Sequence, residues 1–557
     1  MENNSLLPRS QNVLSQIHDR IHCMSIEDMS LLEGVLAEIL LHVRSTMNVA
    51  RSINQFPNNI LCLIFQYALD PLYDEDSPWP NRRSPLPSRK MLRNITHVCH
   101  RWREVAVSTS SLWTILCTRD YVPYDTVLQR SKDSLLKVHV HEGDAEMLKV
   151  FASDAATARI EELRLNYGSM DLSEPHPTSY VQFSAPNLRV AWLDDVEMTA
   201  DGEGVVGPLL FQGNTPCLTS LTLDGVEFLP SNQFENLTHL SIVGLLSSSR
   251  ATLSDVTAFL SGCSRLEELV VEHLDVYVPP DNMNLHAPSL QNLRRMAIGS
   301  AETAGTLLAS WLIAHANRSE GVTARIFDQD TFPLRSEFSS IYGPSFDGLH
   351  TLDVRALHKP ECEPTLVVIA CNALSALRIE CSKSNHSWLE TDDQGSLLWR
   401  NWPLTHVREL RIRESEVVRE HAGLGSLLSR LVSLTSLVVH VGYASKAEKS
   451  NVLRMLAGSQ LLCADLTTLR VISEDVSVVD DIIALATIRA ECKHPLRAVV
   501  LESTQQAVDE HALANLKALD ACVDSLQVVP PSVGPDVEEK WPALCTGGAE
   551  IFWPALY

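Results

Sequence analysis

The stretch from Leu218 to Leu223 reads LTSLTL: an apolar residue, two others, an apolar residue, one other and a third apolar residue. The same spacing returns as LTHLSI from Leu237, LEELVV from Leu266 and LTSLVV from Leu434. Further copies begin at Ile160, Leu349, Leu374, Val407, Leu466 and Leu496, with weaker ones at Leu188, Leu290 and Val322. Strict alternation over a few residues predicts a short strand in each copy.

Copies that recur about every 20–30 residues are typical of leucine-rich repeats, in which one strand and one helix must stack on their neighbours to bury their apolar sides. Helical runs lie between several copies, at 253–263, 304–316, 447–458 and 479–492. We therefore predict an α/β protein in which residues 130–505 form an irregular leucine-rich-repeat solenoid. The Asn or Cys usual after the third apolar position is replaced by Val226 and Leu274, which predicts a weak internal ladder of side-chain hydrogen bonds.

Residues 1–54 are predicted to form an N-terminal helical region. An apolar stripe recurs there at steps of three and four residues; it consists of Leu32, Val35, Leu36, Ile39, Leu40 and Val43. The stripe could pack on the next domain or pair with another helix as a dimerisation device. Because it is short and irregular, we expect it to pack on the next domain.

The segment QFPNNILCLIFQYALD, residues 55–70, predicts a helix over 57–69 that is apolar at nearly every position. A surface helix is normally apolar along one stripe, so the other side of this helix needs a cover. A loop with five prolines follows at 70–90. A further helix is then predicted, with Asn94 as N-cap and one apolar face made of Ile95, Val98, Cys99, Trp102, Val105 and Ala106. STSS ends that helix before Leu112 and Trp113.

Three segments in this order resemble an F-box-like domain over residues 55–116, followed by leucine-rich repeats of the kind common in mushroom-forming fungi. The first match is Phe56-Pro57-Asn58-Asn59-Ile60-Leu61 with Ile64-Phe65. The second is Val98-Cys99, Trp102-Arg103 and Ala106, and the third is Leu112-Trp113. The usual Leu and Glu beside the proline are replaced by Phe56 and Asn59.

The resemblance implies a non-catalytic substrate-recognition subunit of an SCF-type, cullin-based ubiquitin ligase. The box would bind a Skp-type adaptor, and the repeats would capture an unknown protein substrate. Aromatic anchors carry much of the energy of such interfaces, and Phe65 and Trp113 are the expected anchors, with Pro57 setting the entry angle. The adaptor-binding residues expected on this basis are Phe56, Pro57, Ile60, Leu61, Ile64, Phe65, Val98, Cys99, Leu112 and Trp113. Trp102 is expected to belong to the internal core.

The composition disfavours several classes of partner. The formal net charge is -24, whereas a nucleic-acid or anionic-membrane partner calls for a basic surface. The 13 cysteines include no C-x-x-C pair, which favours reduced thiols in an intracellular protein. No signal peptide or membrane-spanning apolar run is evident. We therefore expect a soluble protein of the cytoplasm, the nucleus or both.

No motif predicts a catalytic, cofactor or metal site. Gly202-x-Gly204-x-x-Gly207 is followed by Pro208 and does not open a helix. His18 and His22 share a helix face but lack a third ligand. Three alternatives stay open: an interaction scaffold outside any ubiquitin ligase, a small-molecule sensor, and an enzyme, for which the sequence offers no anchored site. The tail, residues 506–557, repeats the sequence WPAL and is expected to cap the solenoid.

Overall fold

The computed structural model contains two compact units, which are described separately. The first comprises Met1–Tyr73, Pro85–Ile115 and Asp125–Ser134, and the second comprises Asp74–Ser84, Leu116–Tyr124 and Leu135–Tyr557. The structure describes residues 7–69, 89–118, 123–141, 145–166, 180–194, 207–245, 251–274, 276–277, 290–299, 303–315, 321–329, 348–357, 365–382, 391–392, 395–396, 399, 402–421, 423–441, 450–458, 460–473, 478–503, 519 and 522–529.

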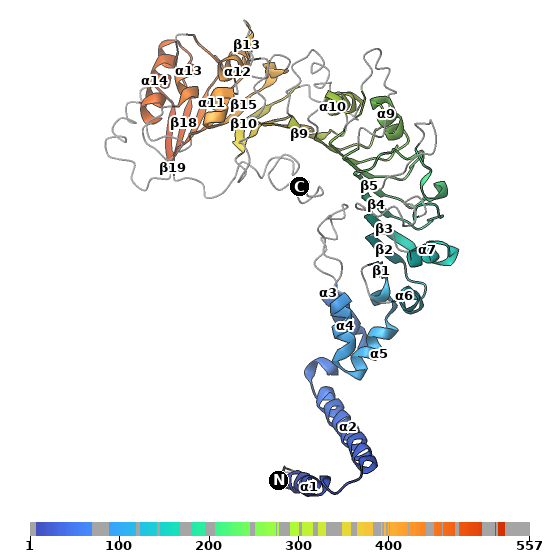
Figure 1. Ribbon diagram of the computed structural model, residues 1–557. Helices are drawn as coiled ribbons and strands as arrows, with labels where there is room; N and C mark the ends of the chain where they lie inside the picture. The colour runs from blue at the N-terminus through green and yellow to red at the C-terminus, as the bar shows by residue number, and fades with distance from the viewer. Residues whose placement is uncertain are drawn as a thin grey trace. The chain divides into compact units, whose positions relative to one another are not determined.

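The first unit is built of helices (Figure 1). They are α1 (Leu7–Ile21), α2 (Ile26–Val49), η1 (Ser52–Gln55), α3 (Asn58–Leu69), α4 (Arg89–Val98), α5 (His100–Ser108) and η2 (Ser110–Trp113), followed by α6 (Tyr124–Ser131), which begins at the boundary between the units. Ser25 caps α2 by accepting a hydrogen bond from the Asp28 amide. The predicted N-terminal helices and the helix after Pro57 are confirmed. A small core joins α3, α4 and α5, and it contains Leu61, Phe65, Leu92, Ile95, Val105 and Ala106.

The single helix predicted from Asn94 is wrong, because two helices occupy that segment. Cys99 is extended, with φ -160° and ψ 169°, and it separates α4 from α5. Asn94 lies inside α4 and is no N-cap. The break resets the helical phase, so Val98 stays half exposed while Val105 and Ala106 are buried. Helix α4 begins at Arg89, so the predicted loop ends before residue 89; residues 70–88 lie outside the described part of the chain.

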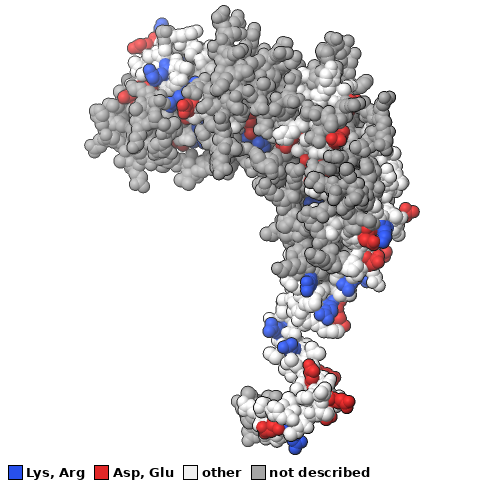
Figure 2. All heavy atoms as spheres, in the orientation of Figure 1, with Lys and Arg blue, Asp and Glu red and all other residues white. Residues whose placement is uncertain are grey.

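Within the described part of the chain, helix α2 does not show the packing on a neighbouring domain that we expect for residues 1–54. None of its residues is buried. Large apolar side chains are exposed along its whole length: Ile26, Met29, Leu31, Val35, Leu36, Ile39, Leu40, Leu41, Val43, Met47 and Val49. Figure 2 shows largely uncharged surface here, with Asp and Glu atoms toward the start of α2. The described chain therefore leaves the apolar stripe without a cover.

The second unit is organised around one long sheet (Figure 1). Its first strands are β1 (Ile115–Cys117), β2 (Leu136–His141), β3 (Ile160–Asn166), β4 (Val190–Asp194), β5 (Ser220–Asp224), β6 (His239–Val243), β7 (Glu268–Glu272), β8 (Arg295–Gly299) and β9 (Thr323–Gln329). Its later strands are β10 (Thr351–Leu357), β11 (Thr365–Cys371), β12 (Ala376–Ser382), β15 (Glu409–Glu414), β16 (Ser436–Val441), β17 (Thr468–Ser473), β18 (Ala498–Ser503) and β19 (Ser525–Val529). A separate hairpin pairs β13 (Thr391–Asp392) with β14 (Gly395–Ser396).

Strands β2 to β9 pair in parallel with their sequence neighbours, and so do β15 to β19. The second apolar position of most copies lies in one buried row, in which Leu221, Leu240 and Leu269 are in register. The third position forms the next row, as Leu223 and its partners show. These observed strands thus lie where the alternation in the sequence predicts them. At β8 the frame is set by Leu293, which precedes Met296 and Ile298 by the usual spacing, so the weak copy assigned to Leu290 is corrected by three residues. The weak copy assigned to Val322 is corrected by one residue, because Ala324 and Ile326 pair with Met296 and Ile298.

Backbone hydrogen bonds connect neighbouring copies where a side-chain ladder is weak. The Gly225 amide donates to Val243, the Gly244 amide to Glu272, and the His273 amide to Gly299. Val226 and Leu274 follow these positions and are buried. The backbone therefore satisfies its own polar groups at the turn after each of these strands, and the apolar side chains there fill the interior.

A hairpin interrupts the sequential order of the strands. Strand β11 is antiparallel to both β10 and β12. Strand β12 then pairs in parallel with β9, and β10 pairs in parallel with β15. The repeat pattern predicts that the copies at Leu349 and Leu374 form adjacent parallel strands. This prediction is wrong, because β11 lies between β10 and β12.

The reason for this hairpin lies in its short connections. A parallel pair needs a crossover of a dozen or more residues, whereas a tight turn returns the chain antiparallel. Asn372 forms such a turn, because its Oδ1 accepts hydrogen bonds from the amides of Leu374 and Ser375. The turn lies against Gly321, which has φ 78° and where a Cβ atom would lie 2.3 Å from the Leu374 carbonyl oxygen. Only glycine fits this close approach.

Helices lie between many of the strands, and α7, α9 and α10 share one face of the sheet (Figure 1). They are α7 (Ala145–Phe151), α8 (Asp154–Thr157), α9 (Leu253–Ser261), α10 (Thr303–His315), α11 (Glu416–His421), α12 (Leu424–Arg430), α13 (Asn451–Leu456) and α14 (Val478–Glu491). The four helical runs expected between copies correspond to α9, α10, α13 and α14. Arg489 of α14 is fully buried and donates to the carbonyl oxygens of Leu462, Cys463, Ala464 and Leu466.

The predicted domain boundaries remain predictions. Strand β19 lies in the expected C-terminal cap and extends the sheet by one strand beyond residue 505. Both WPAL motifs lie outside the described residues, as do Gly202 and Gly204. The cysteines that the structure describes are free, and Cys62, Cys99 and Cys371 are half-buried.

Candidate functional site

Helix α3 turns one side into the core of the first unit. Leu61 and Phe65, one helical turn apart, are 0% and 1% exposed. The ring of Phe65 lies 4.9 Å from that of Trp102, tilted by 53°. These contacts hold α3 against α5 and bury one apolar side of α3.

A second side of α3 is held by polar contacts to the segment after α5. The Sγ atom of Cys62 lies 3.0 Å from the Thr109 hydroxyl, and the amide of Gln66 donates to the Ser111 hydroxyl at 2.7 Å. The two α3 residues are again one turn apart. The rotation of α3 about its own axis is therefore set from two directions.

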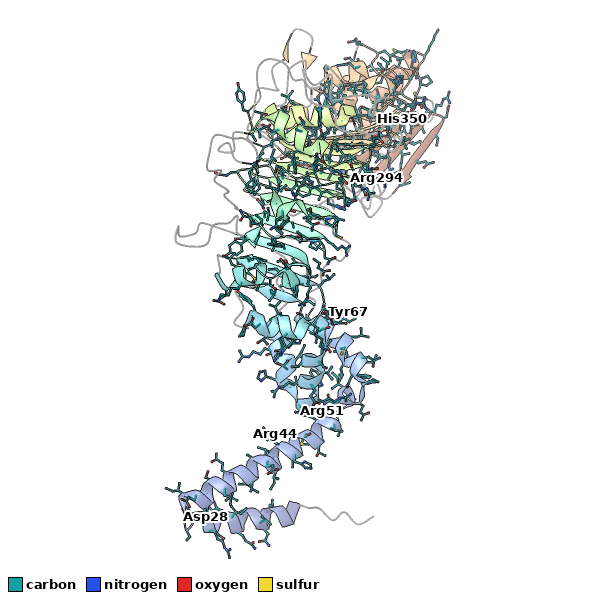
Figure 3. The ribbon with its side chains drawn as sticks, turned by 90° about the vertical axis from the view of Figure 1, so that its right-hand side faces the viewer. Asp28, Arg44, Arg51, Tyr67, Arg294 and His350 are labelled. Atoms are coloured by element: carbon teal, nitrogen blue, oxygen red, sulfur yellow. The ribbon has the colours of Figure 1, made fainter. Side chains whose placement is uncertain are left out.

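The third side of α3 is apolar and accessible, and we call its four residues, Ile60, Leu63, Ile64 and Tyr67, the α3 stripe. Successive helix residues are rotated by ~100°, so these four fall within a sector of about 100°. Leu63 is 48% and Tyr67 81% exposed, and Ile60 and Ile64 are half-buried. Figure 3 labels Tyr67 on this helix. The sequence predicts that this side of α3 needs a cover, and nothing within the described chain buries the α3 stripe.

The chain entering α3 is clamped by α5. The Arg101 guanidinium donates to the carbonyl oxygens of Asn54 and Phe56 and to Oδ1 of Asn58. The indole of Trp102 donates to Oδ1 of Asn54 at 2.6 Å. Pro57 stands directly before α3, and its carbonyl oxygen accepts from the amides of Ile60 and Leu61. Phe56, which precedes Pro57 and the α3 stripe in the sequence, is 45% exposed.

The structure divides the ten expected adaptor-binding residues into three groups. Leu61, Phe65, Leu112 and Trp113 are buried by this chain. Ile60, Ile64 and Cys99 are half-buried. Phe56, Pro57 and Val98 are exposed.

The two expected anchors therefore belong to the interior of the unit. Trp113 donates from its indole nitrogen to the Ala106 carbonyl oxygen at 2.8 Å, and Arg130 lies 4.3 Å from the centre of its ring. Phe65 packs on Trp102, which is core, as expected. Both aromatic residues support the helices that carry the accessible side chains.

Sequence reasoning did not single out Leu63, Tyr67 and Arg101. The two apolar residues could have been found from helical phase, since they lie opposite Leu61 and Phe65 on a helix that is apolar almost all round. Arg101 carries no such signal, because its partners Asn54, Phe56 and Asn58 are more than 40 residues away in the sequence.

Neither a metal site nor a membrane span emerges from the described residues. Over those ranges, no three or more His, Cys, Asp or Glu side chains are grouped so that they could hold a metal ion. Across the same part of the chain, no helix is long and apolar enough to cross a membrane.

Comparison with known proteins bears on this site alone. Residues 53–119 match the family model described as F-box-like. The match includes α3, α4, α5, η2 and all but the first residue of η1, and it supports an F-box protein. No curated protein matches the chain.

Proposed function

We propose that this chain is the substrate-recognition subunit of an SCF-type ubiquitin ligase. Domains of the F-box-like family bind Skp-type adaptors in general, and residues 53–119 match that family. The observation that carries the proposal is the α3 stripe: an accessible apolar sector on a helix whose other sides are fixed by this chain. Laying such a helix into a partner's apolar groove is a common mode of recognition.

The proposed contact surface differs in composition from the one expected from the sequence. Leu63 and Tyr67 join Phe56, Pro57, Ile60 and Ile64 as residues that would touch the adaptor. Leu61, Phe65, Leu112 and Trp113 would act through the support they give to the helices, since they are buried. Val98 and Cys99 remain proposed contacts next to the break between α4 and α5.

We place the protein substrate on the sheet of the second unit, toward β15–β18. Strands β5 and β7 are buried at every position. In β16 and β17 the residues alternate between buried and half-buried, so one face of these strands is accessible. Accessible side chains there include Arg411, Arg413, Val438, His440 and Arg470. This arrangement suits an interaction protein that brings a substrate to a conjugating enzyme held elsewhere, a contribution of proximity.

The test is binding of the purified full chain to a purified Skp-type adaptor, measured by calorimetry. Replacing two apolar contacts of a helix-in-groove interface costs on the order of 2–3 kcal/mol, so L63A/Y67A should bind at least about tenfold more weakly. The matched control is L31A/L41A, which removes two large exposed apolar side chains from α2 of the same unit. The control should bind like the wild type.

Two results would overturn the proposal. One is a wild-type chain that does not bind the adaptor at all. The other is an L63A/Y67A chain that binds as tightly as the control. If the adaptor does bind, affinity capture from cell extract should recover a cullin together with it, which separates a ligase subunit from an interaction scaffold or a small-molecule sensor.

A further inference from the structure

We propose that Arg413 of β15 and His440 of β16 bind a carboxylate group of an acidic peptide segment, so that the protein substrate carries such a segment. The inference rests on the proposed function, because it assigns a chemistry to the sheet face on which the substrate is placed. Both residues alternate with a buried row that includes Leu410, Ile412 and Val439, so they lie on the opposite face of these strands. Arg413 is exposed and His440 is half-buried.

The charges of this part of the sheet leave one arginine without a counter-charge. Strands β10 and β15–β18 carry the arginines Arg355, Arg411, Arg413 and Arg470. Three of them contact a carboxylate: Arg355 pairs with Asp353, Arg411 with Glu409, and Arg470 with Glu502. Among the described residues, no Asp or Glu pairs with Arg413, whose hydrogen-bond partner is His440. The accessible face therefore carries a surplus positive charge at Arg413, which an anionic group of a partner would neutralise.

The contact between the two side chains prepares both of them as donors. Nε of Arg413 donates a hydrogen bond to Nδ1 of His440 at 3.0 Å. Burial, and then the charge of Arg413, lower the pKa of His440, so its ring is neutral near pH 7. Because Nδ1 accepts, the ring proton lies on Nε2, which can donate. Within the described chain the two terminal amino groups of Arg413 make no hydrogen bond, and two parallel donors of this kind match the two oxygen atoms of a carboxylate.

Apolar side chains beside this pair favour a peptide over a nucleic acid. The half-buried apolar residues on the same face are Val438, Ile472 and Val500. Ile472 pairs with His440 in the parallel register, and neighbouring strands lie about 4.8 Å apart. A carboxylate held at Arg413 thus places the flanking residues of an extended peptide over apolar groups. A nucleic acid offers a row of phosphates and calls for several uncompensated cations, whereas these described strands provide one.

The test is binding of a labelled peptide to the purified full chain without adaptor, measured by fluorescence anisotropy. The probe repeats the sequence Glu-Val-Ser, and the control peptide carries glutamine in place of glutamate. We expect the glutamate peptide to bind at least about tenfold more tightly, with an advantage that shrinks as salt is added. Equal binding of the two peptides would overturn the inference.

Substitutions at Arg413 test the geometry of the subsite. R413A should weaken binding of the glutamate peptide by about fivefold or more, since it removes charged donors that are partly exposed. R413K keeps the charge but loses the paired donors, and it should weaken binding by about threefold. The matched control is R454A, which removes an exposed arginine of α13 in the same unit and should change binding by less than about twofold. Circular dichroism of each variant checks that the fold is kept.

Three results would contradict the subsite. One is equal weakening by R413A and R454A, which would show a response to diffuse charge. Another is an R413K chain that binds as tightly as the wild type, because the paired donors would then have no role. The third is a short single-stranded oligonucleotide that binds more tightly than the glutamate peptide and is weakened by R413A, which would assign the site to nucleic acid.

The outcome is separable from that of the proposed function, because the α3 stripe belongs to the other unit. A chain that binds the adaptor but not the glutamate peptide overturns the subsite alone. A chain that binds the glutamate peptide through Arg413 but not the adaptor overturns the proposed function and leaves the subsite in place.

Discussion

At the scale of single residues, the most informative group is the half-buried carboxylate of Glu162 in β3. Its Oε1 atom lies 2.6 Å from Nε of Arg164 and 3.5 Å from Nε2 of His139, and its Oε2 lies 3.7 Å from Nζ of Lys137. Burial alone would raise the pKa of Glu162, but the polar contact with His139 and the charge of Arg164 outweigh it and hold the pKa well below its ordinary value. Burial lowers the pKa of His139, against the opposing effect of Glu162. The carboxylate is therefore charged and the imidazole neutral near pH 7.

The direction of these shifts predicts how the sheet responds to acid. Because the pKa of Glu162 is lower in the folded state, the unfolded chain takes up the proton first. The stabilisation is complete above pH 4.5, the ordinary pKa, and it is lost as pH falls below that value. We expect E162Q to lower the free energy of unfolding of the sheet at pH 7 by about 2 kcal/mol, and therefore to lower its unfolding temperature. The unfolding temperature of E162Q should also depend less on pH below about 4.5. Calorimetric scans at a series of pH values measure both effects.

The control for this prediction is the neighbouring Glu161, which lies at the register shift between β2 and β3 and outside the group formed by Glu162, Arg164, His139 and Lys137. E161Q should leave the unfolding temperature and its pH dependence close to those of the wild type. If E162Q and E161Q behave alike, the ion-pair network around Glu162 does not stabilise the sheet in the way described.

At the scale of elements, the contact between α5 and the entry to α3 decides whether the α3 stripe is presented. Arg101 donates to three oxygen atoms of the segment from Asn54 to Asn58. Hydrogen bonds from a charged donor contribute about 1.5–3 kcal/mol, less when partly exposed. We expect R101A to reduce the protection of α3 amides in hydrogen exchange of the full chain by roughly tenfold.

The matched control is R103A. Arg103 is exposed and donates to a single oxygen, that of Thr96 within the neighbouring α4. Its removal should leave the exchange of α3 amides unchanged. Equal loss of protection in both variants would show that α3 is held by its apolar contacts alone.

At the scale of the whole molecule, the two compact units have separate apolar cores. One core is formed by α3, α4 and α5, and the other by the rows of strand residues such as Leu221 and Leu240. Proteins with separate cores do not in general unfold in a single two-state step. We expect calorimetry to resolve two transitions, with R101A shifting only one of them and E162Q only the other. A single transition that both substitutions shift would contradict this division.

Local patterns were sufficient for much of the fold. Alternation predicted most strands from Ile160 onward, although not β11, β13, β14 or β19. Helical spacing predicted α2, α3 and α9, and the spacing of three short segments predicted the F-box-like match. Each of these signals is contained within a few consecutive residues, because strand and helix periods are local properties of the chain.

The tertiary structure alone decided which side of each element is covered. Leu61 and Leu63 read alike in the sequence, yet one is buried and the other exposed, because α4 and α5 pack against one side of α3. The extended Cys99, the turn at Asn372 and the reach of Arg101 to Asn54 likewise depend on contacts between segments distant in the chain. The sequence by itself thus determined the elements and the repeating pattern, whereas only packing determined their phase and order, since burial is a property of neighbours in space.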